Sequence, residues 1–251
     1  MEEWKPGGSK PTSDGSTIHS IDTSFAIVTA LEELNGAGVT ELATSTGLSK
    51  SSVHKHLRSL QQYDFVVKDG ETYRLGLRYL DLGAHVRSLV PGSAEVKRKL
   101  RELAEETDET SIYTILENAQ TVTLFREMGS KGVSTRTRIG KRLYPHETAA
   151  GKVILSELPT DEVEEIIDAI GLPQVTENTI TDREAFFDEL AAARERGYAY
   201  NLGESVDGLV AISAPLVPDD TVLGACSVTG PYHRLKGDPL DEAVTEALLS
   251  F

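Results

Sequence analysis

Cysteine and tryptophan are nearly absent from this 251-residue chain, which has one of each. The single cysteine, Cys226, excludes an internal disulfide and is typical of a reducing compartment. Long hydrophobic runs are also lacking: no stretch reaches the roughly 18 apolar residues of a membrane span, and no signal-peptide core follows Met1. These absences predict a cytoplasmic protein without membrane association, and the length predicts two domains of ordinary size.

Cations are scarce as well, because 25 lysines and arginines stand against 40 aspartates and glutamates, a net charge of −15. Most of this acidity lies in residues 89–251, which carry −13, whereas residues 1–88 carry only −2 and residues 49–58 carry +3. We expect such acidity from adaptation to high intracellular salt; a chain that folds and binds equally well at low salt would contradict that hypothesis. Under high salt, contacts to phosphate are screened, so affinity for DNA depends more on base contacts and dimerisation.

Residues 39–58 have the pattern of two short helices joined by a turn. Gly47 suits the turn, Ser49 is a candidate N-cap, and Val53 and Leu57 begin a buried stripe on the second helix that continues to Leu60. The opposite face offers hydroxyls, an imidazole and cations, with no carboxylate and no bulky apolar residue. Such groups contact phosphates and base edges in a major groove, although a merely solvated helix face is the alternative.

The sequence before this pair of helices predicts a tail and a further helix. Residues 1–17 are rich in Gly, Ser and Pro, which favours a flexible tail over an arm that touches DNA. Residues 18–35 predict a helix that ends at Asn35-Gly36. Its expected buried stripe consists of Ile21, Phe25, Val28 and Leu31.

A β-hairpin is predicted directly after the two helices. Phe65 to Lys68 and Thr72 to Leu75 are β-prone runs on either side of Asp69-Gly70. Three helices followed by a hairpin make a winged helix-turn-helix over residues 18–76. Lys68 and Arg74 flank the hairpin tip and are expected to meet the DNA backbone, with a solvated hairpin as the alternative. The candidate DNA-contacting residues are therefore Ser49, Lys50, Ser51, Ser52, His54, Lys55, Arg58, Lys68 and Arg74.

A linker helix is predicted over residues 77–92, where Pro91-Gly92 ends it. Leu77, Leu80 and Ala84 form one apolar stripe that is suited to packing against a second subunit. The remaining residues, 93–251, begin with an amphipathic helix over 93–107 and continue with strands, helices and strands. This order predicts an α+β domain with a central antiparallel sheet. Strands are expected over residues 110–116, 121–128, 133–139, 198–200, 209–217 and 221–229, and helices over 146–158, 160–170, 182–196 and 240–251.

Taken together, these motifs resemble the IclR family of transcriptional regulators, from about Ser20 to Phe251. Each motif is weak alone, but their joint order and spacing is specific. The N-terminal match consists of Glu41-Leu42-Ala43, Gly47 to His54, Leu57, Leu60 and Tyr73 to Gly76; the C-terminal match consists of His146 to Lys152, Arg196 to Ala199, Gly208 to Pro215 and Ser227 to Pro231.

The resemblance implies a winged helix-turn-helix, a linker helix and a GAF-like effector-binding domain over residues 93–251. It further implies a homodimer or homotetramer that binds double-stranded operator DNA and responds to a small effector, often an organic acid, an aromatic acid or a sugar derivative. Backbone N–H groups at a helix start suit a carboxylate, and hydroxyls two residues apart on a strand point the same way. The implied effector site consists of Ala149, Ala150, Asn201, Ala211, Ser227 and Thr229. Ordinary sheet and turn roles for these residues are the alternative.

Some positions depart from the family pattern. Asp64 stands where the family commonly has Gly after the recognition helix. This departure leaves open whether the chain enters the wing at the same angle as in other family members. Asn201 stands where some relatives have an acid, which fits an anionic effector. Some relatives hold a metal on Cys, His and Asp ligands. Here Cys226 is alone and is expected to face the core, while His146, Asp207 and His233 lack ligand spacing, so no metal and no cofactor are predicted.

Two other classes of protein are alternatives to a regulator. An enzyme with an attached nucleic-acid module is disfavoured, since one cysteine cannot form and resolve an internal disulfide and no nucleophile elbow, P-loop or H-E-x-x-H occurs. An architectural or non-specific DNA binder is opposed by the acidic C-terminal part. The chain is therefore predicted to be a metabolite-responsive transcriptional regulator and not an enzyme.

Overall fold

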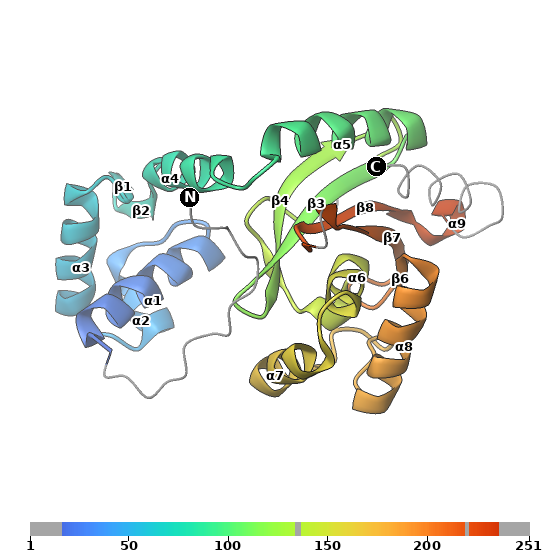
Figure 1. Cartoon of the computed structure of the whole chain (residues 1–251). Coiled ribbons are helices and arrows are strands. Elements are labelled where there is room, and N and C mark those ends of the chain that lie inside the picture. The colour runs from blue at the N-terminus through green and yellow to red at the C-terminus, as the bar shows by residue number, and fades with distance from the viewer. Residues whose placement is uncertain (1–16, 134–136, 219–220, 236–251) are drawn as a thin grey trace. The chain divides into compact units, whose positions relative to one another are not determined.

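The computed structural model describes residues 17–133, 137–218 and 221–235 (Figure 1). The described chain divides into two compact units after Leu89. The predicted tail up to residue 16 and the helix predicted over residues 240–251 lie outside the described residues. No helix in the described ranges is long and apolar enough to cross a membrane.

The N-terminal unit is a winged helix-turn-helix, as the sequence predicts. Its apolar core joins all three helices to the hairpin through Leu31, Leu42, Leu57, Val66 and Tyr73. The hairpin strands pair antiparallel, and Tyr73 also bridges to Ala37 ahead of the second helix. The elements are α1 His19–Glu33, α2 Val39–Thr46, α3 Lys50–Gln62, β1 Val66–Asp69, β2 Thr72–Leu75 and α4 Arg78–Ser88.

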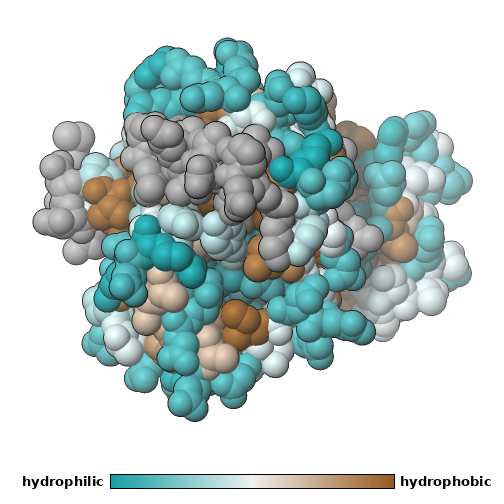
Figure 2. Space-filling view, turned by 90° about the vertical axis from the view of Figure 1, so that its right-hand side faces the viewer, coloured by the Kyte–Doolittle hydropathy of each residue, from teal (hydrophilic) through white to brown (hydrophobic). Residues whose placement is uncertain are grey.

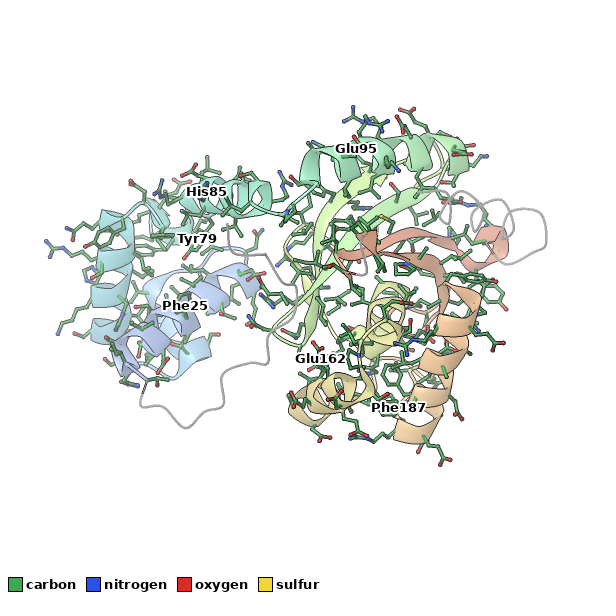
Figure 3. The ribbon with its side chains drawn as sticks, viewed as in Figure 1. Phe25, Tyr79, His85, Glu95, Glu162 and Phe187 are labelled. Carbon is green, nitrogen blue, oxygen red and sulfur yellow. The ribbon has the colours of Figure 1, made fainter. Side chains whose placement is uncertain are left out.

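The prediction of the buried stripe of α1 is wrong for its first two residues. Ile21 and Phe25 are 49% and 63% exposed, and Phe25 is labelled in Figure 3. The face that packs on the other helices instead carries Thr23 and Ile27, followed by Ala30 and Leu31. A polar residue can take the buried position because the Thr23 hydroxyl donates a hydrogen bond to the His19 carbonyl at 2.8 Å.

The ends of α2 and α3 follow from local backbone chemistry. Gly47 takes a φ of 71°, in the left-handed region, and so ends α2. Ser49 caps α3 by accepting a hydrogen bond from the Ser52 N–H. At the other end Asp64 takes a φ of 63°, while the Asp64 and Phe65 N–H groups bond back to the last turn of α3. The predicted hairpin follows this strained aspartate directly.

The C-terminal unit is built on a six-stranded antiparallel sheet, in the order β5-β4-β3-β8-β7-β6. Helix α5 packs on one face through Val96, Leu100 and Leu103, and α6, backed by α8, packs on the other (Figure 1). The elements are α5 Ser93–Thr107, β3 Thr110–Glu117, β4 Gln120–Met128, β5 Arg142–Leu143, the 3-10 turn η1 Pro145–Glu147, α6 Ala149–Ser156, α7 Thr160–Ile170, α8 Arg183–Arg196, β6 Ala199–Leu202, β7 Leu209–Leu216, β8 Gly224–Pro231 and the short α9 Tyr232–Leu235.

The strand predicted over residues 133–139 is not present in its described part, Val133 and 137–139. The Val133 carbonyl accepts hydrogen bonds from the side chains of Arg126 and Thr110, and not from the backbone of a neighbouring strand. The edge of β4 is paired instead by residues 140–143, where the Gly140 N–H bonds to the Thr123 carbonyl and β5 begins two residues later. Strand β8 also begins later than predicted, at Gly224 rather than at residue 221.

Candidate functional site

The exposed face of α3 carries the candidate DNA-contacting side chains. Val53 and Leu57 are fully buried, which turns His54, Lys55 and Arg58 outward into solvent. Ser51 and Lys50 are exposed too, whereas Ser49 and the backbone of Ser52 make the helix cap. No carboxylate among the described residues pairs with the cations Lys50, Lys55 or Arg58. Nitrogen-tipped side chains project from the outer side of α3 in Figure 3.

The wing differs from α3 because its two cations already have partners. The Arg74 guanidinium lies 2.8 Å from the Asp69 carboxylate across the hairpin. The Lys68 ammonium lies 3.6 Å from Glu71 and 5.5 Å from the centre of the Tyr73 ring. Since such exposed pairs contribute little free energy, a phosphate can displace the carboxylates.

A cavity of about 70 Å³ opens between the sheet and the start of α6. All six residues of the predicted effector site line it, although they come from α6, β6, β7 and β8. No charged or aromatic side chain of the described residues is among its walls. The lining residues are Ile112, Thr114, Thr121, Thr123, Thr137, Leu143, Thr148, Ala149, Ala150, Asn201, Ser205, Val206, Leu209, Val210, Ala211, Ser227 and Thr229.

The start of α6 provides donors to this cavity. Thr148 is the N-cap, and its hydroxyl accepts a hydrogen bond from the Gly151 N–H at 2.9 Å. Gly151 has no room for a Cβ, because the Pro145 backbone lies against it. The N–H groups of Ala149 and Ala150 have no acceptor among the described residues. Two free N–H groups at the positive end of a helix are suited to a carboxylate.

Asn201 lies at the cavity wall, but both ends of its side-chain amide are hydrogen-bonded within the chain. Its Oδ1 accepts hydrogen bonds from the Gly203 and Glu204 N–H groups, at 3.0 and 3.1 Å. Its Nδ2 donates to the Ser205 hydroxyl at 3.1 Å and to the Glu147 carbonyl. Asn201 therefore shapes the loop that carries Ser205, and a direct bond to a ligand would need one of these contacts to break.

Ser227 and Thr229 point the same way on β8, and both reach the cavity. The Ser227 hydroxyl donates to the Ser213 hydroxyl at 2.9 Å, and the Thr229 hydroxyl donates to the Val210 carbonyl at 3.1 Å. Each oxygen keeps an accepting lone pair for a ligand. Cys226 faces the opposite side, in the core under α5, where burial raises the pKa of its thiol; its prediction as a core residue is confirmed.

A buried ion pair lies beneath the cavity loop. The Lys152 ammonium of α6 is 2.6 Å from the Glu204 carboxylate and 3.5 Å from Glu189 of α8. The second Glu204 oxygen accepts a hydrogen bond from the Leu202 N–H at 2.7 Å. Sequence reasoning missed this pair, because Lys152 and Glu204 are 52 residues apart and each has an ordinary exposed alternative.

His146 is buried beside this pair. Its Nε2 lies 2.9 Å from the Pro173 carbonyl, its Nδ1 has no partner among the described residues, and its ring meets Phe186 edge-on. Burial lowers the pKa of His146 below its ordinary value, with an opposing contribution from the Pro173 hydrogen bond. In the described parts of the chain, no group of three or more His, Cys, Asp or Glu residues could hold a metal.

An exposed cationic recognition helix with a wing, joined to a domain with a ligand-sized cavity, defines a DNA-binding regulator that responds to a small molecule. Comparison with known proteins agrees. The family model for the C-terminal domain of the bacterial transcriptional regulator IclR matches residues 91–250, and the IclR helix-turn-helix model matches residues 20–70. The chain belongs to the IclR family of transcriptional regulators.

Individual relatives span most of the chain. The HTH-type transcriptional regulator KdgR of Escherichia coli is 31% identical over 91% of this chain and 88% of its own length. A probable HTH-type transcriptional regulator, ArcR of Halobacterium salinarum, is 30% identical over 87% of this chain and 85% of its own length. An IclR homologue from Microbacterium hydrocarbonoxydans, crystallised with 4-hydroxybenzoate, is 22% identical and superimposes with a TM-score of 0.71, covering 90% of this chain and 96% of that chain.

Proposed function

We propose that α3 and the wing of this chain bind double-stranded operator DNA, and that a small organic acid in the cavity changes that binding. The observation that carries the first part is the face of α3, which is exposed and cationic and pairs with no carboxylate of the described ranges. In this proposal His54, Lys55 and Arg58 reach base edges or phosphates together with Ser51. Lys50 and the helix start near Ser49 and Ser52 approach the phosphate backbone.

The wing adds phosphate contacts of its own in this proposal. Lys68 and Arg74 exchange their carboxylate partners for phosphate oxygens when the hairpin meets the backbone of the duplex. Two copies of the chain present two recognition helices, which enter successive major grooves of a palindromic site. We place this activity in the cytoplasm, where such operator DNA lies.

A second subunit is supported by the apolar surface of α4. Leu77 at the N-cap and Leu80 are 82% and 69% exposed and share one face with the exposed Ala84, and α4 has no buried residue. Apolar residues exposed on one helix face are typical of a subunit interface. We therefore propose a homodimer, or a tetramer formed from two dimers, in which α4 packs against its counterpart.

The effector of this proposal binds with its carboxylate at the start of α6, against the free N–H groups of Ala149 and Ala150. Ala211, Ser227 and Thr229 form the facing wall, and Asn201 holds the loop that closes it. The crystallised relative carries an acid, 4-hydroxybenzoate, which supports an acidic effector here. Binding shifts the balance between subunit arrangements that match the half-site spacing and those that do not.

Arg58→Ala tests the DNA-binding part. The operator is first selected from a random duplex library with the wild-type chain, and affinities are then measured by fluorescence anisotropy. We expect about a ten- to hundred-fold loss of affinity, since one base-reading arginine contributes about 1–3 kcal/mol. Arg183→Ala, which removes an exposed arginine of α8, is the matched control and leaves affinity unchanged. Equal operator affinity of the Arg58→Ala variant and the wild type would refute the assignment of α3.

A further inference from the structure

Two threonines at the cavity wall have hydroxyls that no described residue uses. Thr114 of β3 and Thr123 of β4 are 6% and 3% exposed, and they are paired directly opposite each other in the sheet register. Both line the cavity, and neither hydroxyl has a hydrogen-bond partner among the described residues. Among the described residues the buried side-chain polar atoms without a partner are Arg126 Nε and His146 Nδ1, so the two threonine oxygens remain accessible in the cavity and are free to bond to a ligand.

The neighbouring hydroxyls behave differently. Thr121 donates to the Leu143 carbonyl, Ser227 to the Ser213 hydroxyl and Thr229 to the Val210 carbonyl. Their protons are engaged, so toward the cavity they can only accept. Thr114 and Thr123 can both donate and accept. A ligand that satisfies this wall therefore needs oxygen atoms that accept from the two threonines, and O–H groups that donate to the other three oxygens.

The rest of the cavity limits the ligand further. Donors for a carboxylate lie at the start of α6, and no aromatic ring of the described residues is present to stack on a ligand ring. This lining of hydroxyls and backbone N–H groups favours a hydroxylated acid over an aromatic one.

We propose that Thr114 and Thr123 are specificity-determining residues of the effector site, and that they select an aliphatic hydroxy acid over the same acid without hydroxyl groups and over an aromatic acid. The carboxylate binds at Ala149 and Ala150, and the hydroxyl groups of the ligand bind between the paired threonines and β8. This inference rests on the proposed effector function of the cavity and specifies the chemical class of its ligand.

Isothermal titration calorimetry of the full chain tests it with matched acids. Glycerate and threonate are compared with propionate and butyrate, which have the same carbon counts without hydroxyl groups, and with 4-hydroxybenzoate. We expect the wild type to bind glycerate or threonate at least ten-fold more tightly than the other three acids. Tighter or equal binding of propionate, butyrate or 4-hydroxybenzoate overturns the proposal, as does the absence of binding by both hydroxy acids.

Variants then assign the effect to the two hydroxyls. Thr114→Val and Thr123→Val keep the side-chain shape and the β propensity, and each is expected to weaken hydroxy-acid binding about ten-fold. Thr114→Ser and Thr123→Ser retain the hydroxyl and retain binding. Thr107→Val removes a buried hydroxyl that donates to the Leu103 carbonyl and accepts from the Glu109 N–H, and it serves as the control because Thr107 does not line the cavity.

Failure of this proposal can be distinguished from failure of the proposed regulatory function. Unchanged hydroxy-acid affinity in both Val variants, with wild-type circular dichroism, overturns the role of Thr114 and Thr123 even if the chain binds acids. Operator affinity, measured on the same preparations without any acid, is expected to be equal in all of these variants. If the wild type itself binds no operator DNA, that result would instead contradict the proposed function.

Discussion

Breaking the buried ion pair of α6 should show how the cavity loop is held in place. Lys152 is 2% exposed and lies between Glu204, at 2.6 Å, and the more exposed Glu189, at 3.5 Å. Lys152→Met removes the cation and leaves the Glu204 carboxylate buried with one N–H donor, from Leu202. Glu204→Gln leaves the cation with Glu189 as its remaining partner. The two single changes are therefore unequal.

The expected losses of folding stability follow from this asymmetry. Removing one partner of a buried pair destabilises by about 3–5 kcal/mol, whereas replacing both partners with uncharged groups of similar size is often close to neutral. We expect about 3–5 kcal/mol for Lys152→Met, and about 1–3 kcal/mol for Glu204→Gln because Glu189 compensates. The double variant should be more stable than Lys152→Met alone. For a unit of this size, 1 kcal/mol corresponds to about 2–4 °C in Tm.

Guanidinium denaturation of the wild type, both single variants and the double variant measures the coupling free energy directly. Arg183→Ala, which breaks an exposed pair with Asp168, is the control and should leave stability close to that of the wild type. Additive single effects, or a Lys152→Met variant as stable as the wild type, would refute the reasoning that this pair anchors the loop.

Three further predictions follow from single residues. Asp64→Gly should stabilise the N-terminal unit by about 1 kcal/mol in chemical denaturation, since a φ of 63° strains any residue with a Cβ; a loss of stability would contradict this. Burial lowers the pKa of His146, so its contribution to stability is present above about pH 6.5 and is lost as pH falls through the folded pKa. The Tm of the wild type should thus fall between pH 7 and 5 more steeply than that of His146→Gln, and parallel curves would exclude this origin. Leu80→Asp, at a position 69% exposed, should lower the mass measured by light scattering without unfolding the chain, whereas an unchanged mass would place the subunit interface elsewhere.

The sequence predicts the winged helix-turn-helix well because its signals are local. Gly47 and Ser49 fix the turn and the cap by their own backbone chemistry, and the stripe of Val53 and Leu57 determines which side of α3 is exposed. The stripe of α1 fails because the burial of Thr23 depends on a hydrogen bond that hydropathy does not register. Periodicity alone therefore predicts a buried Phe25, which the structure exposes.

The residues of the cavity divide in the same way, into those that sequence motifs predict and those that only the fold brings together. Motifs shared with a known family predict Ala149, Ser227 and the other effector candidates, and the fold brings all of them to one cavity. Thr114 and Thr123 carry no local signal beyond alternation along two strands, because only the register of β3 and β4 pairs them. The engagement of the Asn201 amide likewise depends on a loop conformation that no spacing rule encodes.

The surface of the chain is mostly hydrophilic on the face shown in Figure 2, which agrees with its strong negative charge. The wing has a further electrostatic consequence. Ordinary DNA-binding cations release condensed counterions from the duplex, which makes affinity fall steeply with ionic strength. Asp69 and Glu71 pair with Lys68 and Arg74 and leave the hairpin tip almost neutral, so in the proposed complex phosphate replaces carboxylate around these two cations. We therefore expect the contribution of the hairpin to DNA affinity to depend little on salt concentration, and that of α3 to depend on it steeply.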